Sequence, residues 1–246
     1  MDQSLRPVFL TAHWQHLIML NYEVPAHLLQ AHVPKGTELH LWEGKALVSV
    51  VGFLFKHTKV FGLHWPWHTH FEEINLRLYV RRASGSAWRN GVAFVSEIVP
   101  RPAIAIIANT LYNEHYRYMP TRHSITQPLN GRLAVSYGCK KQGIWHTMQV
   151  EAHAKAEAIA PQSIESFIFN RAWGYNQLSA NKTIEYAVEH EPWQVHAIKT
   201  FNWDGNVEQL YGSQWLPHLC GKPHSVMMAK GSPVVVRKPT VITLPF

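Results

Sequence analysis

The stretch FEEINLRLYVRR, residues 71–82, holds the side chains of this chain that are best suited to chemistry. Its residues alternate between an apolar row, from Ile74 to Val80, and a polar row. The polar row consists of Glu73, Asn75, Arg77, Tyr79 and Arg81. A carboxylate can accept a proton, and a guanidinium can hold an organic anion through parallel hydrogen bonds. Alternation of this kind predicts a β-strand that presents these groups on one face.

Two interpretations of the polar row compete. An antiparallel strand with one wet face shows the same alternation, so the row could be solvated surface. However, the row contains no Thr, Ser or Lys, which are typical of a solvated strand face. In a closed sheet one face points inward, and its charges persist only when they are paired or bound to something. The row would then line a cavity, and the alternation alone does not decide between the two.

The spacing within the row limits direct pairing. Glu73 and Arg77 are four residues apart, which is roughly 13 Å at ~3.3 Å per residue of a strand. Asn75 lies between them. Its amide carries both donors and an acceptor, so it can bridge the carboxylate and the guanidinium.

The composition predicts one β-rich domain over residues 1–246. Hydrophobic residues make up 46% and charged residues 16%, which argues against disorder. Aromatic residues make up 12%, which favours strands and enclosed surfaces over helical bundles.

The charge distribution limits the classes of partner that we expect. The net charge is +7, but the densest basic clusters are only Arg81–Arg82 and Lys140–Lys141, so we expect no nucleic-acid partner. Cys139 and Cys220 form no recognisable motif, which favours reduced thiols. No signal peptide is recognisable, and no apolar run reaches the ~20 residues of a membrane helix. We expect a cytoplasmic protein without a membrane partner, and a homo-oligomer is compatible with the sequence.

The elements that must position the polar row are mostly strands. Helices are predicted within 24–39, over 102–112 and over 161–170. A turn at 83–86 should join the polar-row strand to its partner in a hairpin. The remaining predicted strands cover residues 45–55, 91–99, 131–139, 143–157, 182–191, 193–203 and 232–239. The sum is a mainly β (α+β) fold with a large, strongly bent or closed sheet and three short helices.

Six segments carry a family resemblance: FEEINLRLYVRR, GVAFVSEIVP, RAWGYNQ, IEYAVEHEPW, LYGSQWL and GSPVVV, in this order. In them the chain resembles the YqjF-like family of uncharacterised conserved proteins, from about Trp14 to Val236. That family resembles a branch of the acetoacetate decarboxylase-like superfamily. The resemblance implies a bent antiparallel sheet that closes into a cone around a small-molecule cavity. It therefore places the polar row inside.

The resemblance also suggests one site residue, and it shows that a second residue of the superfamily has no counterpart in this chain. Acetoacetate decarboxylases carry a glutamate in an aromatic-x-Glu step, which Phe71-Glu72-Glu73 matches, so Glu73 is the candidate. Their Schiff-base lysine follows in a Pro-Lys-Lys step. The matching region here, residues 108–118, contains no Lys, and none occurs between Lys59 and Lys140. Schiff-base decarboxylation by the mechanism of that superfamily is therefore not expected.

Three further residues are candidates for the same cavity. His190, in VEHEPW, is a general-base candidate, although a structural role at a strand end is the commoner outcome. Tyr116 lies nearest the missing lysine and can supply a hydroxyl or simply pack. Arg171 ends a predicted helix, where it can answer the helix dipole or hold a carboxylate.

A histidine cluster gives a separate hypothesis. His64, His68 and His70 precede Glu72, and His-x-His on a strand places two rings on one face, as a zinc site requires. The chain has 17 histidines, so chance clustering is easy, and we assign no metal residues. No nucleotide-binding motif is present and no cofactor is expected.

The sequence thus favours binding of a small carboxylate or carbonyl compound in a β-cone cavity. Glu73, with His190 or Tyr116, would do any acid–base chemistry. The expected ligand-binding residues are Asn75, Arg77, Tyr79 and Arg171. The alternatives are a lysine-independent lyase, isomerase or hydratase on the same fold, a metal protein built on the histidines, and a structural or protein-binding role in which Glu73 and Arg77 are exposed.

Overall fold

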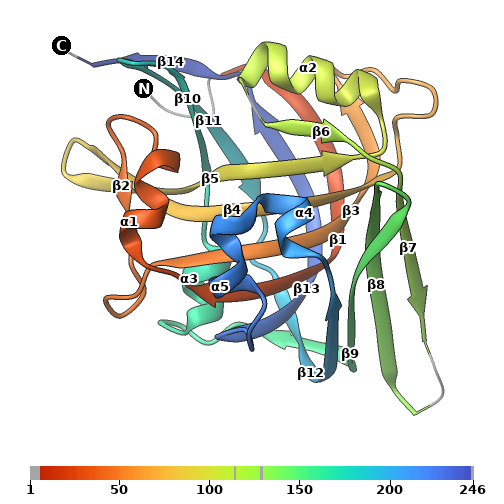
Figure 1. The fold of residues 1–246 in the computed structure, drawn as a ribbon. Coiled ribbons are helices and arrows are strands. Elements are labelled where there is room, and N and C mark those ends of the chain that lie inside the picture. The colour runs from red at the N-terminus through yellow and green to blue at the C-terminus, as the bar shows by residue number, and fades with distance from the viewer. Residues whose placement is uncertain (1–5, 114, 128–129, 245–246) are drawn as a thin grey trace.

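The computed structural model describes residues 6–113, 115–127 and 130–244, with the backbone alone at 108, 111 and 112. One large mixed β-sheet dominates it (Figure 1). The sheet is built from the strands β1 (Val8–Glu23), β2 (Glu38–Leu39), β3 (Leu47–Val60), β4 (Phe71–Ser84), β5 (Ala87–Val99), β6 (Tyr116–Tyr118), β7 (Thr121–Thr126), β8 (Arg132–Lys141), β9 (Ile144–Ala158), β10 (Trp173–Ser179), β11 (Lys182–His190), β12 (Gln194–Asp204), β13 (Ser225–Arg237) and β14 (Thr240–Thr243).

Part of the sheet closes into a barrel. Neighbouring strands pair in the order β11–β10–β5–β4–β3–β1–β13, and β13 pairs back to β11 through Val188 opposite Val236. The sheet then continues from β13 through β12, β9, β8 and β7 as a second wall. The closed sheet expected from the sequence is therefore present.

Strand direction differs from expectation at two places. The pairings β10–β5 and β5–β6 are parallel, whereas an antiparallel sheet was expected. Parallel neighbours need a crossover connection. Helix α2 (Pro102–Tyr112) supplies it between β5 and β6, and it lies above β6 at the top of Figure 1.

The central strands are buried on both faces, and this decides whether the polar row of β4 is solvated surface or cavity lining. The apolar row of β4, from Ile74 to Val80, packs into a core with side chains of β8 and β9 such as Tyr137. Within the polar row, Glu73, Asn75 and Arg77 line the barrel interior, where Glu73 is 3% exposed and Arg77 is 8% exposed. The surface interpretation of these two residues is therefore wrong.

Short helices cover the outer core. Helices α4 (Val207–Tyr211) and α5 (Leu216–Leu219), with the 3-10 turn Ser213–Trp215 between them, lie in front of the central strands in Figure 1. None of these was predicted. The three predicted helices are present as α1 (Ala26–Leu29, extended by the 3-10 turn Gln30–His32), α2, and α3 (Ile164–Phe169).

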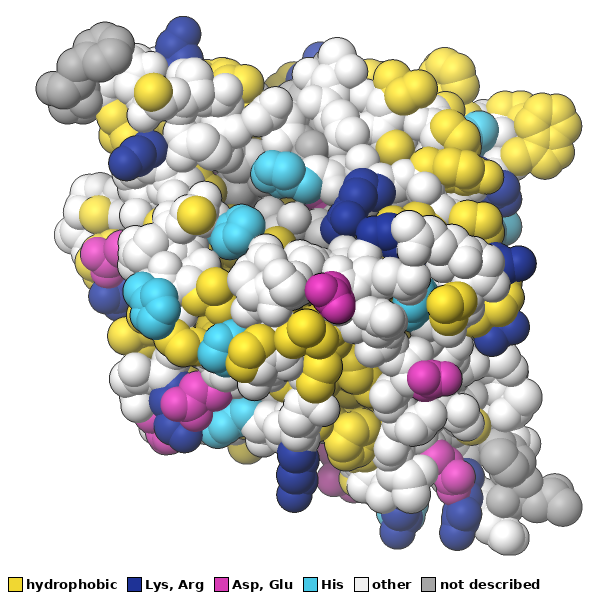
Figure 2. Space-filling model, viewed as in Figure 1, with side chains coloured by type: hydrophobic (Ala, Val, Ile, Leu, Met, Phe, Trp, Pro, Cys, Tyr) yellow, Lys and Arg dark blue, Asp and Glu magenta, His cyan; other side chains and the backbone are white. Residues whose placement is uncertain are grey.

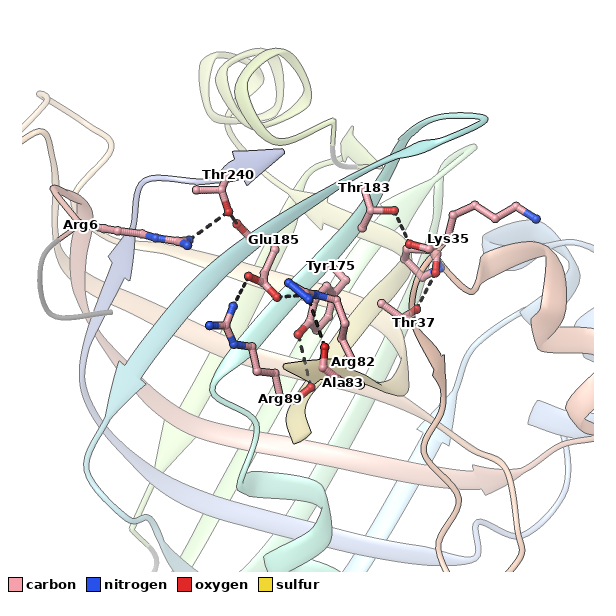
Figure 3. A network of polar contacts seen from close by, with 11 residues as sticks. Arg6, Lys35, Thr37, Arg82, Ala83, Arg89, Tyr175, Thr183, Glu185 and Thr240 are labelled. Carbon is pink, nitrogen blue, oxygen red and sulfur yellow. Dashed lines mark hydrogen bonds and ion pairs between the residues drawn. The ribbon is translucent and has the colours of Figure 1, made fainter. Parts of the chain in front are cut away.

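A buried carboxylate holds the barrel together where its parallel pairing is short. Strands β10 and β5 share a register of only Trp173–Gly174 with Gly91–Val92. Beside it, Glu185 on β11 accepts hydrogen bonds from Arg82 Nε (3.1 Å) and Arg89 Nη1 (2.5 Å), as Figure 3 shows. These ion pairs join the β4–β5 hairpin to β11.

The surface gives no sign of a single charged patch on the face shown. Lys and Arg side chains lie in separate small groups there (Figure 2). Within the described part of the chain, no helix combines the length and apolar character needed to cross a bilayer. The absence of a nucleic-acid partner, the cytoplasmic location and the homo-oligomer remain predictions.

Candidate functional site

The barrel interior contains a cavity of about 250 Å³. Every strand of the closed ring contributes lining residues, because alternate side chains of each strand point inward. Among the described lining residues, the exposed ones are Trp65, Ala103 and Ile107. They belong to α2 and to the segment 61–70 between β3 and β4, so the cavity opens there.

Strand β4 places three polar residues on the cavity wall: Glu73, Asn75 and Arg77. Asn75 Nδ2 donates to Glu73 Oε1 at 2.9 Å. Of the expected bridge between Glu73 and Arg77, only the contact of Asn75 with Glu73 is present. Asn75 Oδ1 is buried without a hydrogen-bond partner among the described residues. That oxygen is available to a donor on a ligand.

Tyr116 completes the surroundings of the Glu73 carboxylate. Its hydroxyl donates to Glu73 Oε2 at 2.8 Å. Strand β6 brings it there by pairing in parallel with β5, where Tyr116 lies opposite Glu97. Asn109 on α2 fixes the backbone of Tyr116 from both sides, since its Oδ1 accepts from Tyr116 N (2.9 Å) and its Nδ2 donates to Tyr116 O (3.0 Å). Tyr116 and Glu73 thus both line the cavity, and a catalytic role for either stays a prediction.

Glu97 is a second carboxylate of the cavity that sequence reasoning missed. It is 1% exposed, lines the cavity from β5, and lies opposite Asn75 in the β4–β5 register. The available signal was a single acid within residues 91–99, where Ser96 is the only other polar side chain. A carboxylate in a buried strand needs polar neighbours, so an acid at position 97 indicates a polar cavity in the same way as Glu73 does.

Arg77 and Arg171 form a cationic end of the cavity. Arg77 Nη2 donates to the carbonyl of Ile168 at 3.4 Å, in the last turn of α3, whose carbonyl end favours a cation. Both Nε atoms are buried without a hydrogen-bond partner, and neither guanidinium forms an ion pair with a carboxylate in the described ranges. Two guanidiniums thus lie near the same Tyr79 ring, without a carboxylate partner among the described residues.

The Arg171 guanidinium is fixed by stacking and by one histidine. It lies 4.0 Å from the ring centre of Phe167 and 5.1 Å from that of Tyr79. Its Nη1 contacts His40 Nδ1 at 2.7 Å. Burial, followed by the charges of Arg171 and Arg81, lowers the pKa of His40 to about 4, so a neutral His40 accepts this hydrogen bond. Burial lowers the pKa of Arg171 to about 9, which leaves it protonated at neutral pH.

Tyr79 supports the cationic end without lining the cavity, as far as the described residues show. Its ring lies under both guanidiniums, with Arg77 at 5.5 Å from the ring centre. Its hydroxyl hydrogen-bonds Ser49 Oγ on β3. Direct ligand contact by Tyr79, expected from the sequence, therefore has no support in the cavity wall. Arg81 is also not among the described lining residues, and it forms an ion pair with Glu38 on β2.

His190 lines the cavity at the end of β11. Its ring stacks on Trp193 with centroids 4.3 Å apart, and its Nδ1 donates to the carbonyl of Glu191 at 2.8 Å. Burial lowers its pKa, the Glu191 hydrogen bond opposes this, and the charge of Arg77 lowers it further. The neutral ring then presents Nε2 as an acceptor. His190 and Glu73 both line the cavity, and joint acid–base action by the two stays a prediction.

The histidine cluster does not assemble as a metal site. His68 Nδ1 hydrogen-bonds the carbonyl of Pro66 (2.7 Å), and His70 Nδ1 accepts from His57 N (3.3 Å). Glu72 hydrogen-bonds His123 and Thr121, and so ties β7 to β4. Across residues 6–113, 115–127 and 130–244, no group of three or more His, Cys, Asp or Glu side chains could hold a metal ion. The metal hypothesis loses its geometric basis.

The cavity also contains no lysine among its described lining residues. The residues that the structure does not describe include no Lys in their sequence. The polar lining includes a carboxylate end with Glu73, Glu97, Asn75 and Tyr116, and the cationic end with Arg77 and Arg171. Thr58, His68 and His190 also line the cavity. Such a site can hold an anion at one end and exchange a proton at the other.

Solved structures show the same fold. MppR, an enduracididine biosynthesis enzyme with HEPES buffer bound, superposes with a TM-score of 0.67 at 12% identity over 97% of this chain and 89% of that chain. An acetoacetate decarboxylase-like enzyme from Sphingomonas wittichii RW1 gives 0.65 at 12% identity, over 100% and 95%. The acetoacetate decarboxylase of Legionella pneumophila gives 0.62 at 11% identity, over 99% and 90%. The expected acetoacetate decarboxylase-like fold is confirmed.

The family is shown by sequence. No curated protein matches the chain. The profile of DUF2071, described as an uncharacterized conserved protein (COG2071), matches residues 11–233, which is most of the chain. The protein whose barrel holds these two arginines opposite two glutamates is therefore a member of the DUF2071 family.

Proposed function

We propose that this protein binds a small organic carboxylate inside the barrel, without Schiff-base lysine chemistry. The ligand carboxylate lies between Arg77 and Arg171, and a carbonyl or hydroxyl group of the ligand faces Asn75 and Glu73. The supporting observation is the pair of buried guanidiniums whose Nε atoms have no partner among the described residues. Buried cations are costly unless an anion compensates them, so a bound carboxylate would stabilise the site.

Two further observations support the proposal. The described cavity wall has no lysine, so a covalent imine has no nucleophile there. MppR, which shares the fold, has been seen with pyruvate bound, and pyruvate is a carboxylate with a neighbouring carbonyl. At 12% identity this likeness concerns the fold, and the ligand class rests on the arginines of this chain.

A thermal-shift panel tests the proposal. Short keto acids, hydroxy acids, acyl acids, aldehydes and divalent metals are compared on the wild type and on Arg77→Gln and Arg171→Gln. A ligand at 100 times its dissociation constant adds about 2.7 kcal/mol of stability, which raises the melting temperature clearly.

Arg132→Gln is the matched control, because Arg132 pairs with Glu151 on the exposed surface. Carboxylates should shift the wild type and this control alike. Each cavity variant should bind about 10- to 100-fold more weakly, since a hydrogen bond to a charged group contributes about 1.5–3 kcal/mol. Equal shifts in all four proteins would refute the carboxylate site.

The second candidate is a lysine-independent acid–base enzyme, a lyase, isomerase or hydratase on the same fold. The observation that favours it is the hydrogen bond from Tyr116 to Glu73, which gives a carboxylate and a hydroxyl in proton-transfer contact at the cavity wall. Glu73→Gln should abolish turnover of a ligand found in the panel while preserving its binding. Equal loss of binding would make Glu73 a ligand contact and not a catalyst.

A further inference from the structure

The cavity wall beyond the polar residues is aromatic. The rings of Phe55 and Phe71 stack with centroids 4.6 Å apart and an interplanar angle of 13°. Trp14 packs edge-on against Phe53 at 5.2 Å and against Phe55 at 5.7 Å. All four line the cavity. This wall offers a ligand apolar contact and no charge.

The lining residues follow one another in a fixed order along the strands. On β4 the lining residues Arg77, Asn75, Glu73 and Phe71 follow one another at two-residue steps, about 6.6 Å each. Phe71 lies opposite Phe55 on β3. The aromatic pair is therefore at the end of the row away from the Arg77 guanidinium, with the acid and amide groups between.

The mouth continues the apolar end. Trp65, which is 51% exposed, and Ile107, which is 39% exposed, line the cavity from the segment 61–70 and from α2. In the same segment Leu63 is 62% exposed and Trp67 is 84% exposed. Figure 2 shows hydrophobic side chains gathered at the upper right, where Figure 1 places the connection between β3 and β4 near α2. The cavity thus opens through apolar side chains and has its cations at the far end.

From this order we infer that the ligand is an amphipathic carboxylic acid. Its carboxylate enters first and reaches Arg77 and Arg171, and its alkyl or aryl body lies along Phe55, Phe71 and Trp14 toward the mouth. The inference rests on the proposed carboxylate site. It adds that short acids such as pyruvate fill only part of the cavity, since they leave the aromatic wall without contacts. Each methylene of the body that enters the wall removes apolar surface from water.

A homologous series of acids tests the inference. Acetate, butanoate, hexanoate, octanoate and decanoate are titrated calorimetrically into the wild type. The affinity should rise about fourfold for each added methylene, which corresponds to ~0.8 kcal/mol per buried methylene, until the chain emerges at the mouth. Arg77→Gln should weaken every member of the series.

A matched pair of variants on α2 locates the body of the ligand. Ala103 lines the cavity, whereas Ile106 is 65% exposed and is not among the described lining residues. Ala103→Trp should weaken the long acids and leave butanoate unchanged, and Ile106→Trp should bind the whole series as the wild type does.

The outcomes separate the two proposals. Binding of short and long acids with equal affinity would overturn the amphipathic ligand and leave the carboxylate site intact. Equal weakening of the whole series by Ala103→Trp would overturn the position of the body. No binding of any acid would refute the carboxylate site itself, and this inference with it.

Discussion

The hydroxyl of Tyr116 donates a hydrogen bond of 2.8 Å to Glu73 Oε2, across 43 positions of the chain. The other carboxylate oxygen accepts from Asn75 at 2.9 Å. The carboxylate is thus oriented by two elements, β4 and β6, at the wall of the barrel cavity. A group positioned in this way can act on a ligand without first searching for its geometry.

Tyr116→Phe should reduce ligand affinity or turnover by about 10- to 100-fold. The substitution removes one donor from a buried carboxylate, and a hydrogen bond to a charged group contributes about 1.5–3 kcal/mol. Titration of a ligand from the panel measures the effect. Tyr118→Phe is the control on the same strand, because Tyr118 is 56% exposed. If the two variants behave alike, the hydroxyl of Tyr116 has no role in the site.

Asn109→Ala should act through Tyr116. Asn109 forms two hydrogen bonds with the backbone of Tyr116 and is itself exposed. In the wild type the substitution should weaken binding several-fold, and in the Tyr116→Phe background it should add little. A double-mutant cycle measures this coupling. Strictly additive losses would mean that Asn109 only stabilises α2, and Thr110→Ala on the same helix serves as the control.

Glu185→Gln should destabilise the barrel by about 3 kcal/mol or more. Glu185 is 1% exposed and holds Arg82 and Arg89, so loss of its charge leaves two partly buried cations unpaired. Chemical denaturation gives the change in the free energy of unfolding. Glu151→Gln, which breaks the surface pair with Arg132, should cost less than about 1 kcal/mol. Equal losses in both variants would contradict the role of the Glu185 pairs in closing the barrel.

Stability should fall as the pH decreases from 6.5 toward 4. Burial is the main cause that lowers the pKa of His16 and of His40 from 6.5 to about 4, so the unfolded chain binds more protons in this window. The loss begins below pH 6.5 and levels off below about pH 4.

His16→Asn should reduce this pH dependence. Position 16 has φ 52°, which Asn adopts readily. Denaturation midpoints at several pH values measure the slope, and His27→Asn at an exposed position is the control. A slope unchanged from the wild type would show that His16 does not contribute.

The fold could be predicted where its pattern was local. The alternation in residues 71–82 gave β4, and the turn at 83–86 gave its hairpin with β5. Strand β1 was missed because it is buried on both faces in its second half, so no alternation marks it there. The short strand β10 was missed as well. It forms a hairpin with β11, and its first four residues are buried without polar alternation.

The candidate site could be predicted only in part. Glu73, Asn75 and Arg77 share one strand face, so their common environment follows from spacing. Arg171 comes to the same cavity from a distant part of the chain, through α3 and the barrel closure, and no local pattern reports that. Tyr79 is not among the described lining residues, and its ring lies near both guanidiniums, so ligand contact by Tyr79 stays a prediction.

The central claim is that Arg77 and Arg171 hold a ligand carboxylate. The most direct measurement is calorimetric titration of one acid from the panel and of its uncharged amide, into the wild type and into the double variant Arg77→Gln/Arg171→Gln. We predict that the wild type binds the acid and not the amide, and that the double variant binds neither. Equal binding of acid and amide by the wild type, or retention of the acid by a folded double variant, would contradict the account.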